Sequence, residues 1–530
     1  MARYEYKRFA YRKPPEIGGT AERRVVIVGA GPAGLSAAID LAQRGVATTV
    51  LDDNDVVSLG SRAICWSKRT LEIFDRLGVG ERMVAKGVTW QVGRLFHRDR
   101  EVYSFDLLPE AGHKMPAFIN LQQYYVEQYL AERAADFPGL IDLRWKNRVT
   151  GVDSQADGAA LDVETPDGGY RIEAEWVIAC DGARSPMRSF LGLGFTGRAF
   201  EERFLIADVE MKADFPSERW FWFDPPFHSG RSALLHKQPD DIYRIDLQLG
   251  PDADPEAEKQ PERVIPRIRA MVGERPFEID WVSVYSFQCS RLERFVHGRV
   301  IFAGDSAHVV SPFGARGGNG GIQDIDNLGW KLALTLQGKA GPGLIDSYDE
   351  ERVRGADENI LNSARSTGFM TPKNEAESLF RDAALELAAD MGFARRLVNS
   401  GRLSLPCALD GLSLQSPECV AGALSPGTPC PDAPLARGGE TGWLLNELSD
   451  GFTLLSVDAQ APRIDGIAAL EIAGADAGDE RWLDAQGHAA RRYGSGNVYL
   501  VRPDGHIAAV FREPNIGAVK TARHRATGFQ

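Results

Sequence analysis

Residues 24–52 read RVVIVGAGPAGLSAAIDLAQRGVATTVLD and predict how this chain begins to fold. The β-branched run over 24–28 favours a buried strand, and the apolar spacing after Gly34 favours a helix that ends near Gly45. A second strand follows and ends at Asp52, eighteen residues after Gly34. The order strand, glycine-rich turn, helix, strand and acid predicts a βαβ unit that binds a dinucleotide.

The three glycines of the G-x-G-x-x-G turn have different steric roles. Gly29 allows the tight turn, Gly31 lets the backbone approach a pyrophosphate, and Gly34 lets helix and strand pack closely. The helix N-terminus then faces the phosphates with the positive end of its dipole. Asp52 can accept hydrogen bonds from ribose hydroxyls. This motif alone does not distinguish NAD from FAD.

The composition restricts the class of protein. At about 150 residues per domain, 530 residues predict three to four domains. The content of 43% hydrophobic and 25% charged residues is typical of soluble globular domains. The formal net charge of −13 disfavours nucleic acid and anionic membranes as partners. No apolar run is long enough to cross a bilayer, and the start of the chain lacks the apolar core of a secretory signal.

The six cysteines predict neither a metal site nor a redox pair. None lies in a C-x-x-C pair or has the paired spacing of a zinc site. We therefore expect reduced thiols, a cytoplasmic protein and no bound metal.

Two further segments pair an acid with a glycine after a strand. CDGARSPMR at 180–188 contains Asp181 and Gly182, and GRVIFAGDSAH at 298–308 contains Asp305. The second segment continues into a loop over 313–321, in which five of nine residues are glycine, and then into a helix. Because glycine lowers helix propensity, this composition indicates that something approaches the backbone closely.

With these three motifs in this order, residues 23–362 resemble the single-component FAD-dependent aromatic hydroxylases of the para-hydroxybenzoate hydroxylase fold. The resemblance extends to phenol hydroxylases and 3-(3-hydroxyphenyl)propionate hydroxylases. It implies an α/β fold: a Rossmann-like FAD-binding domain, an inserted, mostly antiparallel β-sheet substrate domain, and a C-terminal thioredoxin-like α/β domain.

The resemblance also implies roles for particular residues. Asp305 is expected on the ribityl chain, Pro312 beside the isoalloxazine, and Asn319 near its pyrimidine edge. Asp52 replaces a more usual glutamate, and Trp66 replaces a smaller aliphatic residue. The residues expected to bind FAD are Gly29, Gly31, Gly34, Asp52, Arg62, Gln123, Asp181, Gly182, Asp305, Gly318 and Asn319.

The expected domain boundaries follow from the motifs and from changes in composition. Residues 186–285 contain several alternating strand patterns. The C-terminal domain lacks C-x-x-C, so we expect an interface or scaffolding role rather than disulfide exchange. The segments are an N-terminal arm over 1–20, an FAD-binding domain over 21–185 and 286–365, a substrate domain over 186–285, a helical segment and linker over 366–425 (the helical pattern spans 366–403), and a thioredoxin-like domain over 426–530.

Residues that would contact the substrate are harder to assign. In IYRIDLQL at 242–249, Arg244 and Asp246 share one face, which is more consistent with a solvated sheet face than with a site. The candidates for substrate contact are His228, His236 and Arg244, while His308 is expected to have a local structural role.

The resemblance implies the following reaction. NADH or NADPH reduces FAD, and the reduced flavin reacts with O₂ to give a C4a-hydroperoxide. This species hydroxylates a small aromatic substrate, most simply a phenol. Attack on the ring requires partial deprotonation of the phenol, so a base is expected, although the sequence does not identify it. Only one G-x-G-x-x-G occurs, so a second Rossmann unit for NAD(P)H is not expected. Separately, we expect the protein to be a homodimer.

Three alternatives remain open. Trp220, Trp222 and Pro225 match part of the W-x-W-x-I-P motif of flavin-dependent halogenases, but Asp224 replaces the isoleucine. A flavin-dependent dehydrogenase or reductase acting on a polyprenyl substrate would share the front motifs and would not consume O₂. A non-catalytic flavin scaffold or sensor would bind FAD without substrate-stimulated oxidation of NAD(P)H.

Overall fold

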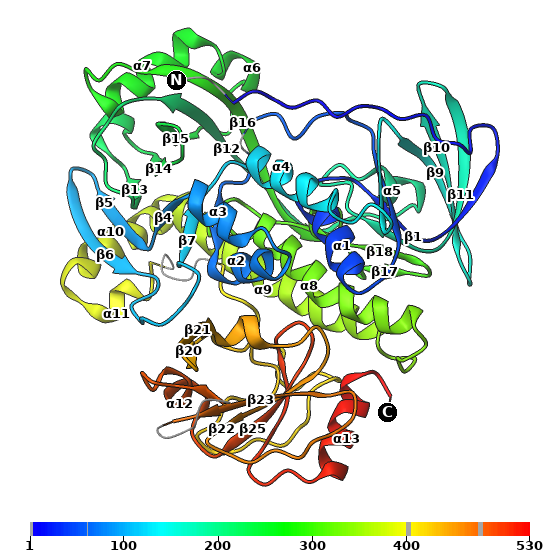
Figure 1. The fold of residues 1–530 in the computed structure, drawn as a ribbon. Coiled ribbons are helices and arrows are strands. Elements are labelled where there is room, and N and C mark those ends of the chain that lie inside the picture. The colour runs from blue at the N-terminus through cyan, green and yellow to red at the C-terminus, as the bar shows by residue number, and fades with distance from the viewer. Residues whose placement is uncertain (1–3, 61, 399–403, 475–480, 530) are drawn as a thin grey trace.

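The three strands that precede the acid and glycine motifs lie side by side in one sheet. The computed structural model describes residues 4–60, 62–398, 404–474 and 481–529. In the first sheet, β1 pairs in parallel with β11 and β2, and β11 pairs in parallel with β18, in the order β17-β18-β11-β1-β2-β8 (Figure 1). The bounds are β1 (Thr20–Val28), β2 (Thr48–Asp52), β8 (Ile141–Trp145), β9 (Arg148–Ser154), β10 (Ala159–Thr165), β11 (Gly168–Ala179), β17 (Val296–His297) and β18 (Val300–Phe302).

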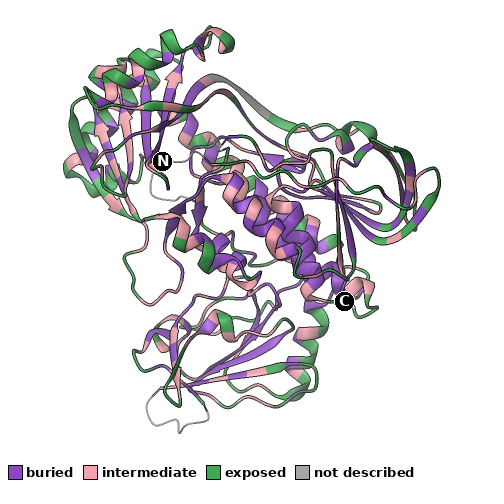
Figure 2. Cartoon of the chain, turned by 45° about the horizontal axis from the view of Figure 1, so that its top comes forward, coloured by how far each residue is buried: buried purple, intermediate pink, exposed green. Residues whose placement is uncertain are grey.

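Helices bury the apolar strands of this sheet. The strand residues Val25, Val26 and Ile27 are fully buried, as the β-branched run predicts. Figure 2 shows the central strands and helices in purple, as buried. The helices of this region are α1 (Pro32–Gln43), α2 (Lys68–Arg76), α3 (Gly80–Lys86), α4 (Gln123–Ala134), α5 (Pro186–Phe190), α8 (Gly317–Leu336) and α9 (Asp346–Met370). A small sheet of β3 (Cys65–Ser67), β7 (Phe118–Asn120) and β4 (Val88–Trp90) lies beside them.

The second sheet contains the strands predicted within residues 186–285. Its order is β19-β16-β12-β15-β14-β13-β5-β6, with mostly antiparallel pairing. One face packs on α7 (Pro261–Val272) through side chains such as Leu205, Ile245 and Val264. The bounds are β5 (Val92–His97), β6 (Arg100–Asp106), β12 (Thr196–Glu210), β13 (Arg219–Phe223), β14 (Ser232–Lys237), β15 (Ile242–Leu249), β16 (Glu278–Arg291) and β19 (His308–Val309).

Two strands of this sheet depart from the expected boundaries. Residues 92–106 lie inside the segment assigned to the FAD-binding domain, yet β5 pairs in parallel with β13 of the second sheet. Pairing between strands more than one hundred residues apart leaves no local pattern in the sequence. The expected helical segment over 366–403 divides into the end of α9, α10 (Glu375–Asp390) and α11 (Gly392–Arg395), and residues 399–403 lie outside the described residues.

The C-terminal domain contains a third, mixed sheet. Its order is β21-β20-β24-β23-β22-β25-β26, and β25 and β26 pair antiparallel at one edge. The thioredoxin-like arrangement stays a prediction. The bounds are β20 (Pro434–Arg437), β21 (Glu440–Trp443), β22 (Thr453–Val457), β23 (Ala468–Ala473), β24 (Trp482–Leu483), α12 (His488–Tyr493), β25 (Asn497–Val501), β26 (Ile507–Phe511) and α13 (Ile516–Ala526).

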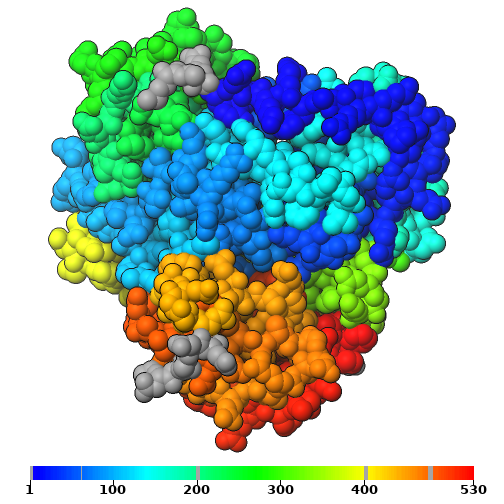
Figure 3. All heavy atoms as spheres, viewed as in Figure 1, coloured from blue at the N-terminus to red at the C-terminus, as the bar shows by residue number. Residues whose placement is uncertain are grey.

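The N-terminal arm lies along the outside of the chain, in dark blue in Figure 3. Tyr4 stacks on Tyr124 of α4 with a ring-centroid distance of 4.1 Å, and Phe9 stacks on Trp145 at 4.4 Å. Aromatic pairs of this kind stabilise an extended segment that has few backbone partners. Within the described residues, we find no helix with the length and apolar composition that a bilayer crossing requires.

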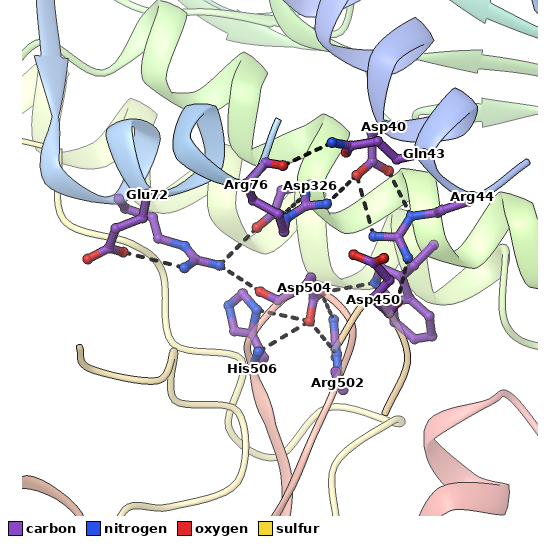
Figure 4. A network of polar contacts seen from close by, with 12 residues as sticks. Asp40, Gln43, Arg44, Glu72, Arg76, Asp326, Asp450, Arg502, Asp504 and His506 are labelled. Atoms are coloured by element: carbon purple, nitrogen blue, oxygen red, sulfur yellow. Dashed lines mark hydrogen bonds and ion pairs between the residues drawn. The ribbon is translucent and has the colours of Figure 1, made fainter. Parts of the chain in front are cut away.

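A buried network of charges attaches the C-terminal domain to the rest of the chain (Figure 4). Arg502 donates to Glu351 of α9 at 2.6 and 2.9 Å and to Asp504 at 2.5 and 3.0 Å. Asp504 also accepts from the indole of Trp330 on α8 at 3.1 Å, and its carbonyl oxygen accepts from Arg69 on α2 at 2.6 Å. Because Arg502 and Glu351 are inaccessible to solvent, their charges must be compensated within the protein, and Glu351 also accepts from Lys331 at 2.8 Å.

Replacing Arg502 by methionine leaves two buried carboxylates without their guanidinium. We expect Arg502→Met to lower the free energy of unfolding by about 3–5 kcal/mol, measured as a shift in the urea midpoint. Arg463→Met is the matched control, because the Arg463–Glu471 pair is exposed and contributes at most about 1 kcal/mol. Equal midpoints for the two variants would contradict the role assigned to the network.

Candidate active site

A large cavity opens where the carboxyl ends of β1, β11 and β18 meet. Its volume is about 1330 Å³, and its wall includes the strand ends, the start of α8 and one face of the second sheet. Drug-sized ligands occupy pockets of roughly 300–1,000 Å³. The cavity therefore has room for a dinucleotide and a second molecule. The crevice at the carboxyl ends of parallel strands is also where open α/β sheets bind ligands.

Most of the residues selected from the sequence reach this cavity. Gly34 lies within α1, away from the wall. His228 also lies outside, where its Nε2 donates to the carbonyl oxygen of Gln248 at 2.7 Å, so the structure does not support it as a substrate contact. The selected residues that line the cavity are Gly29, Gly31, Asp52, Arg62, Gln123, Asp181, Gly182, His236, Arg244, Asp305, Pro312, Gly318 and Asn319.

The first glycine turn has the shape that a pyrophosphate requires. Gly29 has φ +103°, and a Cβ there would lie 2.5 Å from the carbonyl oxygen of Cys180. A Cβ at Gly34 would lie only 1.9 Å from the carbonyl oxygen of Gly29, whereas Gly31 faces open space. No side chain of the described residues caps the N-terminus of α1. Its backbone N–H groups are therefore available to phosphate oxygens.

Three acids on the wall present oxygens to a bound sugar or polyol. Asp52 accepts from the N–H groups of Ala30 at 2.6 Å and Asn54 at 2.9 Å, which orients its carboxylate. Asp181 accepts from one N–H, while its Oδ1 has no partner among the described residues. Burial raises the pKa of each of these two carboxyls and that of Asp305. Hydroxyl donors from a ribose or a ribityl chain fit such acceptors.

The two amide side chains on the cavity wall form their hydrogen bonds with the protein itself, not with a ligand. Asn319 accepts from the N–H of Ser67 at 2.9 Å and donates to the carbonyl oxygens of Cys65 and Ala315 at 2.9 and 2.6 Å. Gln123 similarly accepts from an N–H at 3.1 Å and donates to Glu127 at 2.7 Å. Their side chains thus position the loops around a cofactor, and α8 begins without a side-chain cap beside them.

The unexpected tryptophan has a steric explanation. Trp66 is fully buried and donates from its indole to the carbonyl oxygen of Leu121 at 2.9 Å. A Cβ at Gly318 would lie 3.3 Å from the ring of Trp66. The absence of a side chain at Gly318 therefore makes room for the larger residue at position 66.

The polar face of the second sheet covers the other side of the cavity. Arg219, His236, Arg244 and Asp208 are successive neighbours across β13, β14, β15 and β12. The expectation of a solvated face for Arg244 and Asp246 is wrong, because both are buried on the cavity wall. The face is covered by the first domain, which a strand pattern cannot reveal.

The charges on this face differ in how they are compensated. Arg244 bonds to Asp208 at 3.0 and 3.3 Å, so its charge already has a partner and a bound carboxylate would have to compete. Burial raises the pKa of Asp246 to about 6. Burial, with the charges of Arg219 and Arg244, lowers the pKa of His236 well below its usual range, so that imidazole is neutral. Asp246 and Arg219 were not selected as candidates from the sequence.

The tryptophans shared with halogenases point away from the cavity wall. Trp220 and Trp222 alternate with Arg219 on β13 and so lie on the opposite face of the sheet. The indole of Trp220 donates to Glu218 at 2.7 Å, and Trp222 stacks on Phe96 at 5.1 Å. These contacts are packing contacts, and they remove the observation that favoured a halogenase.

Comparison with known families agrees with this geometry. The family model described as "FAD binding domain" matches residues 22–363. The chain belongs to this FAD-binding family. The match confirms the resemblance drawn from the three motifs and identifies FAD as the cofactor that the turn, the acids and the loop would hold. Among the described residues, no group of three or more His, Cys, Asp or Glu side chains could hold a metal ion.

Three similar proteins extend the comparison. A 3-(3-hydroxy-phenyl)propionate/3-hydroxycinnamic acid hydroxylase of Mycolicibacterium smegmatis is 28% identical over 71% of this chain and 66% of its own length. A flavin-dependent monooxygenase of Mycobacteroides abscessus is 29% identical over 92% of this chain and 96% of its own. The crystal structure of the flavin-dependent monooxygenase PieE, with FAD and substrate, shares the fold, with TM-score 0.77, 23% identity and coverage of 96% and 97%.

A side chain at Gly29 should prevent FAD from binding. The Cβ of Gly29→Ala would collide with the backbone at Cys180, and its positive φ disfavours alanine. We expect the purified variant to lose the visible absorbance of bound flavin. Gly139→Ala, at a glycine with open space and no positive φ, should keep it. Equal flavin content in the two variants would contradict the proposed seat of the pyrophosphate.

Proposed function

We propose that this chain hydroxylates a phenolic compound with O₂, using NADH or NADPH as the reductant. The chain is an FAD-dependent aromatic hydroxylase, which the family match and the names of its relatives support. One observation supports a substrate site next to the flavin. The buried polar face of the second sheet lines the same cavity as Pro312 and Asn319. FAD, when bound, supplies electron transfer and oxygen activation. The protein orients the substrate, excludes water from the site and provides charged groups near the reacting atoms.

The wall near Pro312 keeps water away from the reacting atoms. Phe313 packs against Phe204 and Phe287, with ring-centroid distances of 4.7 and 5.4 Å. Aromatic rings at this position shield the space beside the loop from bulk solvent. A dry site protects an oxygen-activating centre from proton leakage and side reactions.

Asp246 is the best base on the wall for the phenol proton. Its pKa of about 6 lets it be ionised at neutral pH and still accept a proton readily. Its Oδ1 is buried and no described residue bonds to it, so a substrate hydroxyl in the cavity would supply the hydrogen bond that this atom lacks. His236 is a weaker candidate, since the two nearby guanidinium groups oppose its protonation.

Substrate-stimulated oxidation of NAD(P)H tests the proposed function. We expect the FAD-loaded enzyme, given 3-(3-hydroxyphenyl)propionate, 4-hydroxybenzoate or 4-nitrophenol, to oxidise NADH or NADPH faster and to yield a product heavier by one oxygen atom. Turnover without O₂ consumption would indicate the reductase. Bound FAD with no stimulation by any phenol would indicate the non-catalytic scaffold.

A neutral residue at position 246 should remove one limb of the pH profile. The carboxylate acts as a base only above its pKa, so kcat/KM of the unmodified enzyme should fall as the pH drops below about 6. Asp246→Asn should lose about 10²–10⁴-fold in kcat and lack this acid limb. Asp252→Asn, at an exposed loop position, is the control. An acid limb that persists in Asp246→Asn would assign the base elsewhere.

We also propose a homodimer in the cytoplasm. An apolar surface on α10 and α11, where Leu379, Phe380, Met391 and Phe393 are exposed, supports contact with a second copy. All six cysteines lie in the described part of the chain and are free thiols there, which fits a reducing compartment. Light scattering should give twice the mass of one chain, and the mass of a single chain would refute the dimer.

A further inference from the structure

One arginine on the cavity wall forms no ion pair with any residue that the structure describes. Arg219 is the first residue of β13 and is 8% exposed. Within the described part of the chain, no hydrogen bond or ion pair reaches its guanidinium. Burial lowers its pKa, which is the direction expected of a cation withdrawn from water without full compensation.

The other buried arginines of the described residues show which partners a buried guanidinium normally has. Each one bonds to a carboxylate or to an amide oxygen, as Arg244 does to Asp208. A buried charge without a partner is strongly unfavourable, so proteins seldom retain one without a function. The arginines with partners are Arg69, Arg144, Arg244, Arg316, Arg352, Arg381 and Arg502.

The groups around Arg219 do not neutralise it. His236, opposite it on β14, is neutral, and burial raises the pKa of the Cys65 thiol to about 11. Asp246 on β15 influences it through space but forms no ion pair with it. Arg94, on the neighbouring strand β5, is engaged with Glu218 and Glu101. No described group of the protein therefore forms a direct ion pair with Arg219, and that position is left to an anionic group of a ligand.

The surroundings of Arg219 also define the shape of that ligand. Arg219 lines both the main cavity and a small adjoining cavity of about 60 Å³. The second cavity is largely apolar and aromatic, with Phe221, Phe223 and Phe313 in its wall. A guanidinium with a fixed fork of donors binds a carboxylate through two parallel hydrogen bonds.

We propose that Arg219 binds the carboxylate of the substrate, and that the substrate is therefore a phenolic acid. This inference rests on the proposed aromatic hydroxylation and narrows its substrate class. The aromatic ring lies between the sheet and the Pro312 loop, with its hydroxyl toward Asp246 and its acid toward Arg219. Arg244, selected from the sequence for this role, instead holds Asp208 in place.

Binding of matched probes tests the proposal. We compare 3-(3-hydroxyphenyl)propionate with 3-propylphenol, which lacks the carboxylate, by calorimetry on the FAD-loaded protein. The unmodified protein should prefer the acid. Arg219→Met should weaken binding of the acid by about 10- to 100-fold and leave the neutral phenol unchanged, and Arg219→Lys should recover part of the loss. Arg263→Met, at an exposed arginine of the same domain, should change neither affinity.

Thermal stability separates this role from a structural one. Without ligand, Arg219→Met should melt at or above the temperature of the unmodified protein, because it removes an uncompensated buried charge. Arg244→Met should melt lower, because it leaves Asp208 buried without its arginine. A marked loss of stability in Arg219→Met would mean a structural role and overturn the proposal.

The outcomes also separate this proposal from the proposed function. Preference for the acid that depends on Arg219, without an oxygenated product, would retain the anion site and refute the hydroxylase. Hydroxylation of both probes with equal KM in Arg219→Met and the unmodified enzyme would retain the hydroxylase and refute the anion site. No preference for the acid in the unmodified protein would refute the anion site as well.

Discussion

The close approach of Gly29 to the backbone of Cys180 is the constraint on which the site depends. A Cβ at Gly29 would lie 2.5 Å from that carbonyl oxygen, so the turn after β1 can pack this closely on the end of β11 only if residue 29 is glycine. Their adjacency brings the first motif to Asp181, and β18 on the far side of β11 adds Asp305. Three segments distant in sequence thus meet at one sheet edge, where a dinucleotide can be held by backbone N–H groups and carboxylates.

The second sheet closes one side of the cavity, and its two faces meet different surroundings. One face is apolar and packs on α7, while the other carries Arg219, His236 and Arg244 into the cavity. The first domain encloses that face, and each charge on it interacts more strongly with its neighbours because the protein interior screens charges less than water does. Arg244 is compensated within the protein, whereas Arg219 and Asp246 are left to act on a ligand.

The C-terminal domain is tied to the same framework. The Arg502–Glu351 pair connects it to α9, and Asp504 connects it to α8, whose first turn forms part of the cavity wall. Such buried pairs contribute little net energy compared with apolar packing, but breaking one is costly. This arrangement is consistent with a scaffolding role for a domain that lacks C-x-x-C.

The local patterns of the sequence determined the cofactor half of this protein. The glycine spacing, the strands that end in acid and glycine, and the alternation of faces in 242–249 each depend on neighbouring residues, and the structure contains the elements they predict. Only the tertiary structure decided the substrate half. It paired β5 with β13, covered the face of Arg244 and Asp246, and left Arg219 buried without a partner among the described residues. Burial and charge compensation depend on which distant segments pack together, and a strand pattern records only that two faces differ, not which of them meets water.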